Sequence, residues 1–424
     1  MRLFITAFLA GIALIGGEVG AADHAHTLGE IKSREAPVQL SSNALSKLDL
    51  SVSSRIPQAG SVKLERLELR TTATGTIRLL GLPEANTTLL NRIAGVTSGD
   101  DYVFLSLDPR LQAYTDQVVK QAKAPHVSVV VMDPRTGKIL ALSDKSSTIP
   151  ELSLHAGFPA ASLFKIITAA AALEKGTIKP LTKIFFRGGN YTLDKWNYKP
   201  SRHDKRSMTV AEALGKSVNP VFGRIALQLL SPRIIRSYTN SFGFNSSLDF
   251  DVELPTSKAH IPESDFSLSR TAAGFGDVYI SPIHAAAIVS ALANRGVMPR
   301  PYLVDKVVSP SGNLLYASQP SALQRIVQEK TADLLLQMME YTTTVGTSSR
   351  EFRYKNKPVL KGIPVAAKTG TLSGRNPKGI NNWFVATAPL HDPQVAVSVI
   401  VVNPGGISSK ASHIGRLMIQ KFFE

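Results

Sequence analysis

The sequence predicts a mixed α/β (α+β) fold in which one sheet is covered by helices. Two observations carry this prediction. Runs of β-branched and apolar residues typical of buried strands occur near residue 127 and again at 382–388 and 395–402. Long apolar stretches of helical character fill the sequence between these runs. Strands from both ends of the sequence therefore meet in one sheet, and the intervening helices pack on it.

Composition and patterning divide the 424 residues into three parts. Residues 1–22 combine Arg2, an apolar stretch and small residues, which is typical of a cleaved signal peptide or of an uncleaved anchor. Residues 23–100 are polar and predict a linker or a small pedestal, with an alternating segment at 66–70 that suggests a strand. Residues 101–424 are long enough for a large buried core and form the main domain.

The main domain begins with a helix and a hairpin. Asp108 is the expected N-cap of a helix whose first residue is Pro109. Residues 127–132 and 139–142 read as two strands, and the turn residues at 133–138 join them.

Helices are expected in the middle of the chain and strands near its end. Ser162 starts a helix that is apolar on nearly every side and is therefore central and buried. Further helical regions are predicted at 209–230, interrupted at Asn219-Pro220, and at 282–295 and 328–343. Residues 364–368 lead as a strand into the motif Lys368-Thr369-Gly370-Thr371, which ends that strand and precedes the two late strands, and a closing helix covers 409–423.

Charge and composition exclude several functions. The chain has no cysteine, which excludes disulfides, thiol catalysis and cysteine-ligated metal. Neither His-Glu-x-x-His nor Gly-x-Ser-x-Gly occurs, so we expect no zinc hydrolase, no Ser-His-Asp hydrolase, no metal and no cofactor. The net charge of +16 is diffuse and forms no nucleic-acid motif. It suits an anionic membrane or cell-wall surface, although basic surfaces are also common in proteins without such a partner.

Ser162 and Lys165 lie three residues apart and share one face of the predicted helix. A lysine accepts a proton only when its pKa falls, which burial and a neighbouring cation both cause. The apolar helix supplies the burial, and Lys368 is a candidate for the cation. Ser162 is therefore a candidate nucleophile with Lys165 as its base. The alternative is a capping serine followed by an unrelated lysine.

Two further motifs carry matching chemistry. Ser217 offers a hydroxyl that passes protons between amines, and Asn219 offers a carboxamide for a substrate amide. In the motif Lys368-Thr369-Gly370-Thr371, the lysine and the hydroxyls suit a carboxylate, and Gly370 permits close backbone approach. Each motif alone also fits an ordinary turn.

Together the three motifs resemble the transpeptidase domain of penicillin-binding proteins, of the class B type in a short form. The resemblance extends from about residue 101 to the end and includes segments at 133–141, 211–222, 274–276, 281–282, 291–297 and 383–386. It implies an antiparallel sheet covered by helices, together with an all-helical subdomain, as in β-lactamases.

The resemblance also implies a function, namely D,D-transpeptidation of peptidoglycan. Ser162 would attack between two terminal D-alanines of a stem peptide, Lys165 would take its proton, and Ser217 would relay a proton to the leaving D-alanine. Asn219 would orient the peptide, Lys368, Thr369 and Thr371 would hold its carboxylate, and the backbone N–H groups of Ser162 and Thr371 would form the oxyanion hole. β-Lactams would acylate Ser162, and the chain would act as an exported protein.

Several alternatives remain open at this stage. Water in place of the acceptor amine gives a D,D-carboxypeptidase, and rapid deacylation gives a serine β-lactamase. Residues 253–256 do not match the glutamate element that one class of β-lactamase uses. A non-catalytic penicillin-binding sensor or scaffold is a third alternative, which three intact motifs disfavour. The sequence does not indicate whether a cell-wall synthesis complex holds the chain.

Overall fold

The computed structural model describes residues 102–424 except 252, 310 and 312, together with the backbone of four short earlier strands. These strands are β1 (Leu69–Thr71), β2 (Ile77–Leu79), β3 (Thr87–Leu89) and β4 (Arg92–Val96). The predicted signal segment, residues 1–22, and most of the predicted linker lie outside the described residues.

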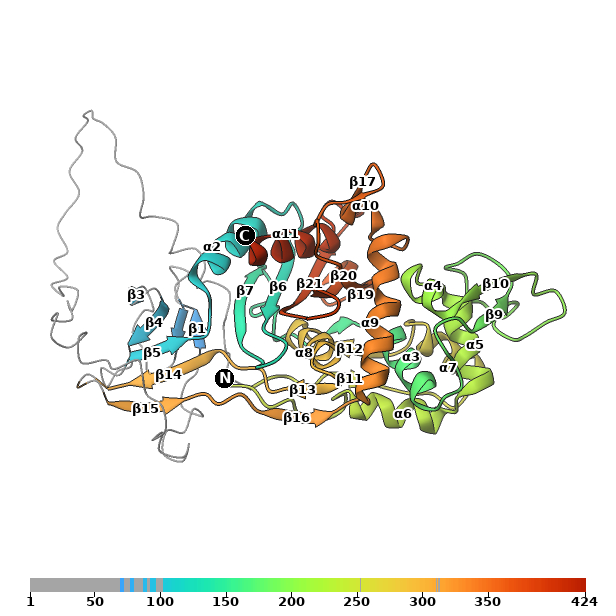
Figure 1. Cartoon of the computed structure of the whole chain (residues 1–424), viewed down its shortest axis with the longest axis horizontal. Coiled ribbons are helices and arrows are strands. Elements are labelled where there is room, and N and C mark those ends of the chain that lie inside the picture. The colour runs from blue at the N-terminus through green and yellow to red at the C-terminus, as the bar shows by residue number, and fades with distance from the viewer. Residues whose placement is uncertain are drawn as a thin grey trace.

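A five-stranded antiparallel sheet forms the centre of the fold (Figure 1). Its order is β19-β20-β21-β6-β7, so strands from both ends of the main domain lie side by side. The strands are β6 (His126–Met132), β7 (Ile139–Lys145), β19 (Ala366–Arg375), β20 (Lys378–Ala388) and β21 (Val395–Asn403). Every residue of β21 is buried, because helices cover both faces of the sheet. The predicted antiparallel sheet covered by helices is confirmed.

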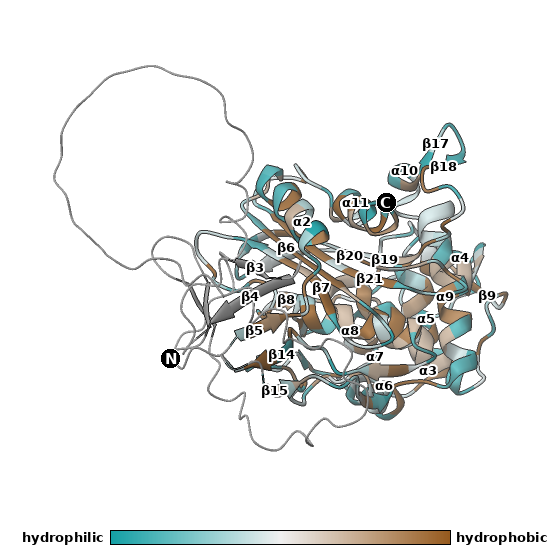
Figure 2. Ribbon diagram, turned by 60° about the vertical axis from the view of Figure 1, so that its left-hand side comes forward, coloured by the Kyte–Doolittle hydropathy of each residue, from teal (hydrophilic) through white to brown (hydrophobic). Residues whose placement is uncertain are grey.

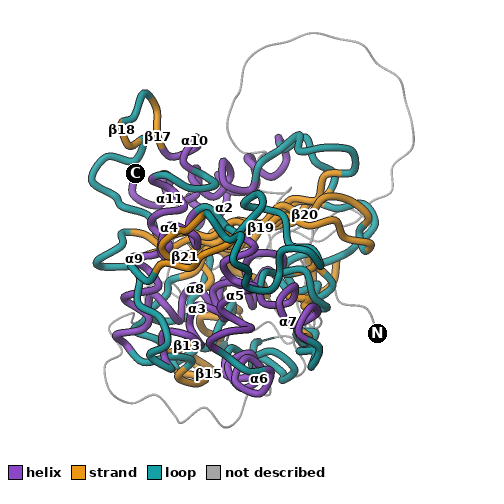
Figure 3. Tube along the Cα trace, turned by 90° about the vertical axis from the view of Figure 1, so that its right-hand side faces the viewer, coloured by secondary structure: helices purple, strands orange, loops and turns teal. Residues whose placement is uncertain are grey.

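Two helices cover one face of the sheet. They are α2 (Pro109–Gln121) and α11 (Ala411–Phe423), which appear above the strands in Figure 3. Asp108 caps α2 as predicted, since its carboxylate accepts a 2.8 Å hydrogen bond from the Leu111 N–H. The apolar core on this face includes Phe384 and Met418.

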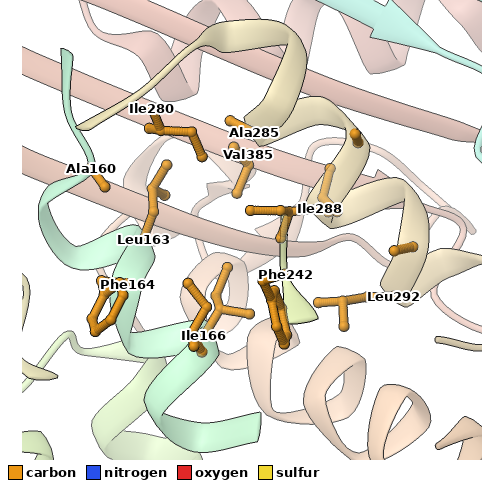
Figure 4. Packing of buried hydrophobic residues seen from close by; sticks show 14 of the residues in the cluster. Ala160, Leu163, Phe164, Ile166, Phe242, Ile280, Ala285, Ile288, Leu292 and Val385 are labelled. Atoms are coloured by element: carbon orange, nitrogen blue, oxygen red, sulfur yellow. The ribbon is translucent and has the colours of Figure 1, made fainter. Parts of the chain in front are cut away.

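The opposite face carries the larger core and the helix that follows Ser162. The helices are α3 (Phe164–Glu174), α8 (Pro282–Ala293) and α9 (Glu329–Thr344). Residues 164–173 of α3 are all buried, as predicted. Figure 4 shows Leu163 and Ile166 among the buried side chains of Ile288 and Val385, and Figure 2 shows the apolar colour concentrated in these inner elements.

A helical subdomain packs beside α3 and α9, at the end of the molecule away from β3 and β4 (Figure 1). It contains α4 (Val210–Gly215), α5 (Asn219–Leu229), α6 (Pro232–Ser241) and α7 (Asp265–Ala272). It also contains the antiparallel pair β9 (Lys183–Phe186) and β10 (Arg206–Thr209), so the predicted subdomain is largely rather than wholly helical.

A second five-stranded sheet joins the main domain to the preceding strands. Its order is β15-β14-β5-β4-β3, where β5 is Tyr102–Leu105, β14 is Val304–Val308 and β15 is Leu314–Ala317. Strand β4 therefore pairs across the predicted boundary at residue 100, and the division into domains stays a prediction. The alternating segment at 66–70 is described only from Leu69 onward, where β1 begins.

Short elements complete the chain. They are β8 (Phe158–Pro159), the 3₁₀ turn η3 (Ala161–Leu163), β11 (Lys258–Ala259), β12 (Val278–Ile280), β13 (Val297–Pro299), β16 (Ala322–Arg325), α10 (Ser349–Phe352), β17 (Arg353–Tyr354) and β18 (Lys357–Pro358).

Three local predictions need correction. Ser162 lies in η3, and the α-helix begins only at Phe164. The interruption in the 209–230 region falls at 216–218, because Pro220 suits the first turn of a helix, and α5 therefore begins at Asn219. The Lys-Thr-Gly motif does not end a strand. It lies inside β19, which continues to Arg375 because β20 pairs with it along its whole length.

Candidate active site

The three motifs converge at one place, although 206 positions separate Ser162 from Lys368. Ser162 sits in η3, Lys165 in the first turn of α3, and Ser217 with Asn219 at the junction of α4 and α5. Lys368 comes from β19. The fold thus brings side chains of all three motifs within hydrogen-bonding distance of one another.

Lys165 is the centre of the cluster and is fully buried. Its Nζ lies 2.7 Å from Ser162 Oγ, 2.7 Å from Asn219 Oδ1 and 2.7 Å from the Ala273 carbonyl oxygen. Burial, followed by the nearby charge of Lys368, holds the pKa of Lys165 well below its usual value.

A neutral Lys165 has one arrangement that satisfies these partners. The Asn219 and Ala273 oxygens only accept hydrogen bonds, so they take the two N–H groups of the neutral amine. The remaining lone pair then faces the Ser162 hydroxyl. An amine in this arrangement can accept the Ser162 proton.

Ser217 stands between two lysines. Its Oγ lies 3.1 Å from Lys368 Nζ and 3.4 Å from Lys165 Nζ. Its backbone has a left-handed φ of 55°, which is uncommon for a serine and turns the chain between α4 and α5. A hydroxyl in this position connects the two amines by hydrogen bonds and can pass a proton between them.

Lys368 is also completely buried, and burial lowers its pKa to about 7. Its Nζ donates to Ser217 Oγ and to the Thr369 carbonyl oxygen, at 3.1 and 2.8 Å. Lys368 is not among the side chains that line the cleft. Its amine therefore lies behind the cleft surface and contacts Ser217, which does line the cleft.

Two glycines let the nucleophile turn pack closely. A Cβ on Gly274, which has a φ of 98°, would lie 2.3 Å from the Ala161 carbonyl oxygen. A Cβ on Gly370 would lie 3.3 Å from the Ala160 carbonyl oxygen and 3.3 Å from the Ala161 Cβ. The expected close approach at Gly370 is thus made by the protein's own nucleophile turn.

A cleft of about 440 Å³ opens in front of these groups. Among the predicted site residues, its lining includes Ser162, Ser217, Asn219, Thr369 and Thr371, whereas Lys165, Lys368 and Gly370 lie behind the surface. Bases and charges are thus shielded from water, while the hydroxyls and the carboxamide face the substrate space.

Sequence reasoning missed several residues of the cleft. Tyr191, Thr347, Asn382 and Lys410 also line it, and they come from separate loops and strands. Thr347 contacts Thr369 through their hydroxyls, and Asn382 Nδ2 donates to Thr371 Oγ1 at 3.2 Å. No local pattern marks these residues, because only tertiary packing brings them to the motif residues.

Within the described part of the chain, no cluster of three or more His, Cys, Asp or Glu side chains suits a metal ion. The same residues contain no helix with the length and apolarity needed to cross a bilayer.

Comparison with known proteins gives consistent matches. Residues 127–419 match the family described as the penicillin-binding protein transpeptidase domain. Peptidoglycan D,D-transpeptidase PbpA of Mycobacterium tuberculosis is 28% identical over 377 residues, covering 78% of this chain and 74% of that protein. PbpA of Mycolicibacterium smegmatis is 26% identical over 336 residues, covering 69% of this chain but only 66% of the relative.

A solved structure supports the same conclusion. Penicillin-binding protein A from M. tuberculosis, as its ceftriaxone acyl-enzyme complex, superposes with a TM-score of 0.63 at 25% identity, covering 76% of this chain and 80% of that one. The matched family covers most of the main domain, including all three motifs. The chain therefore belongs to the penicillin-binding protein transpeptidase family.

Proposed function

We propose that this chain is a serine-type peptidoglycan D,D-transpeptidase that cross-links stem peptides through an acyl-enzyme on Ser162 and is inhibited by β-lactams. One observation carries the assignment of roles, namely the buried Lys165 Nζ at 2.7 Å from Ser162 Oγ. The names of the relatives, which are peptidoglycan D,D-transpeptidases, support the reaction class.

The acylation step uses the groups in the cleft. Ser162 Oγ attacks the carbonyl carbon between the two terminal D-alanines while Lys165 Nζ takes the hydroxyl proton. The backbone N–H groups of Ser162 and Thr371 stabilise the oxyanion. The C–N bond then breaks, and Ser217 passes a proton from the amine pair to the nitrogen of the departing D-alanine.

The remaining steps complete the transfer. Asn219 orients the donor peptide, and Thr369 and Thr371, with the charge of Lys368, hold its terminal carboxylate. The amine of a second stem peptide attacks the Ser162 ester, and its proton leaves through the same amines. The ester C–O bond breaks, an amide forms, and Ser162 regains its hydroxyl proton. Water in place of the amine gives the carboxypeptidase reaction.

Labelling with fluorescent penicillin tests this proposal. Wild type should form a stable covalent label, whereas Ser162→Ala should form none and should still melt cooperatively. Nitrocefin turnover on the same samples should be slow. Rapid nitrocefin turnover would instead assign a β-lactamase, and labelling without any reaction on D-Ala-D-Ala donors would assign a sensor.

We also propose that the chain acts outside the cytoplasm, on the outer face of the cytoplasmic membrane or in the periplasm. Peptidoglycan, its proposed substrate, lies there, and the pattern of residues 1–22 supports export. Fractionation of cells that produce the full chain tests this placement, because recovery in the cytoplasm would contradict it.

A further inference from the structure

We propose that the loop of residues 187–197, called here the loop platform, binds the sugar strand of peptidoglycan beside the cleft. This inference rests on the proposed function, since it identifies how the same site holds the polymer that carries the stem peptide. The surface that supports it lies outside the three motifs and belongs to the helical subdomain.

Exposed apolar side chains concentrate on and beside the loop platform. Ten large apolar side chains are exposed in the described part of the chain, and four of them lie within residues 181–196. Tyr191 is 65% exposed and Trp196 is 53% exposed. Such a concentration of aromatic surface on a water-facing loop is typical of a binding site.

The exposed indole is held in place. The Arg187 guanidinium lies 5.8 Å from the centre of the Trp196 ring and donates a hydrogen bond to the Trp196 carbonyl oxygen. The backbone of Gly188 lies against the ring, because a Cβ there would come within 2.9 Å of it. A fixed aromatic ring loses little conformational entropy when a ligand stacks on it.

Buried polar residues anchor the loop from below. Asn197 is fully buried, and its Nδ2 donates to the carbonyl oxygens of Thr192, at 3.0 Å, and Arg187, at 3.2 Å. The buried Arg224 donates to the Asn197 carbonyl oxygen at 2.8 Å and forms an ion pair with Asp204 at 2.6 Å. The loop platform is therefore a built surface that presents its aromatic rings on a firm base.

The loop platform is continuous with the catalytic cleft. Tyr191 lines the cleft, and its carbonyl oxygen accepts a 2.7 Å hydrogen bond from Asn219 Nδ2. The Asn190 carbonyl oxygen accepts another from the Asn219 N–H, also at 2.7 Å. The same asparagine thus touches Lys165 on one side and the loop platform on the other.

The volume of the cleft and the charge of the surrounding residues indicate which ligand the loop platform binds. A cleft of about 440 Å³ has the volume of a site for one drug-sized molecule, so it holds the end of a stem peptide and leaves the attached sugars outside. Residues 179–206 contain eight Lys and Arg residues against two Asp. A strand that carries acidic stem peptides matches both the positive charge and the aromatic rings, whose faces stack on the apolar faces of sugars.

Binding measurements on whole chains test the proposal. Uncross-linked peptidoglycan strands are the ligand, and Ser162→Ala is the background, so that no turnover alters the strands. Adding Trp196→Ala should raise the dissociation constant for strands about tenfold, as loss of a central aromatic anchor does. Trp196→Tyr should keep most of the affinity. Tyr354→Ala is the matched control, because Tyr354 is a 69% exposed aromatic beside Lys355 on another hairpin.

Two further measurements separate the possible outcomes. A sugar-free pentapeptide should bind equally to both Trp196 forms, and β-lactam acylation of Trp196→Ala with Ser162 intact should match wild type, because Trp196 does not line the cleft. Unchanged strand affinity in Trp196→Ala would overturn the proposal. Binding to vesicles of anionic phosphatidylglycerol is measured in parallel. If Trp196→Ala lost affinity for these vesicles but kept its affinity for strands, the surface would be assigned to a membrane and the proposal would be overturned.

The two proposals fail in different ways. Absence of penicillin labelling in wild type would defeat the proposed function and leave strand binding measurable in the Ser162→Ala background. If Trp196→Ala lost its cooperative melting, strand binding would be compared in Trp196→Tyr and Arg187→Gln instead. Full strand affinity in Arg187→Gln would then count against the loop platform, because its indole would no longer be held.

Discussion

Lys165 and Lys368 are both completely buried, and their burial sets the chemistry of single residues in this site. Burial disfavours the charged form of each amine, and the charge of Lys368 further disfavours the charged form of Lys165. In the proposed mechanism, the lone pair of Lys165 accepts the Ser162 proton. Lys368, with a pKa of about 7, is partly charged at neutral pH.

The substitution Lys165→Arg keeps hydrogen-bond donors at this position, with a permanent positive charge, but removes the ability to accept a proton. Arginine keeps donors toward Asn219 and Ala273 but does not lose its proton in proteins. Acylation by fluorescent penicillin should therefore slow by about 10²–10⁴-fold, the range of a lost general base. Stopped-flow labelling measures the rate, and thermal melting checks the fold. Acylation within tenfold of wild type would contradict the role of Lys165.

Acylation should show a bell-shaped dependence on pH. The rate constant kcat/KM rises as Lys165 loses its proton, at a pH well below the usual lysine range. It falls as Lys368 loses its proton near pH 7, because a neutral amine no longer attracts the substrate carboxylate. A penicillin methyl ester lacks that carboxylate and should lose the alkaline decline. An equal decline for acid and ester would contradict the role of Lys368.

Stability should also change with pH through Lys368. Its pKa is about 7 in the folded protein and near 10.5 in the unfolded chain, so the unfolded chain binds more protons between these values. The free energy of unfolding therefore rises with pH in this window, by up to about 1.4 kcal/mol per pH unit. Urea unfolding at pH 7.5 and 9.5 measures the rise. In Lys368→Met the free energy of unfolding should rise less between these two pH values. An equal rise in the variant and in wild type would contradict the low pKa of Lys368.

At the scale of elements, the position of the nucleophile depends on how closely η3 packs against its neighbours. Strand β19 approaches η3 at Gly370, where a Cβ would make tight contacts of 3.3 Å, and the Gly274 loop approaches η3 where a Cβ would lie only 2.3 Å from a backbone oxygen. Trp383 of β20 donates from Nε1 to the Pro159 carbonyl oxygen at 2.8 Å, just before the nucleophile turn. The turn is thus fixed from three sides.

Gly274→Ala tests this packing, with Gly176→Ala as its matched control. Both glycines have positive φ, but nothing lies within 4 Å of a Cβ on Gly176. Gly176→Ala should cost about 1–2 kcal/mol from its backbone conformation alone. Gly274→Ala should cost more and should slow acylation at least tenfold, since it displaces Ala161. Denaturant unfolding and penicillin labelling measure both effects. Equal stability losses, or unchanged acylation, would contradict the packing argument.

At the scale of the whole molecule, the central sheet separates the core under α2 and α11 from the core that contains η3 and α3. Helices α2 and α11 cover one face, and the catalytic elements η3 and α3 lie on the other, so the two cores are distinct. A cavity under α11 should therefore destabilise the protein without moving the nucleophile. A change behind η3 should move the nucleophile as well as lower the stability.

Met418→Ala and Trp383→Phe form the matching pair. Met418 is fully buried in the α11 core, and its truncation should cost about 2–5 kcal/mol of unfolding free energy while folded protein is acylated at the normal rate. Trp383→Phe leaves the Pro159 carbonyl unpaired, which should cost about 1–3 kcal/mol and slow acylation roughly tenfold. Equal acylation rates in both variants would contradict this separation.

Much of the fold and of the site follows from local sequence. The Asp108 cap, the hairpin at 127–142 and the buried helix after Ser162 were predicted because capping, alternation and apolar composition are local signals. The break before Asn219 and the position of Lys368 inside β19 were misjudged, because helix ends and strand lengths depend on packing and on pairing with β20.

The sequence by itself determined the chemical inventory: a serine and a lysine one helical turn apart, a second serine with an asparagine, and a lysine followed by small hydroxylated residues. Only the tertiary structure decided the protonation chemistry. The pKa of Lys165 falls because the fold buries this amine completely and places Lys368, 203 positions later, close to it. Desolvation and charge proximity act through space, and so no local pattern encodes them.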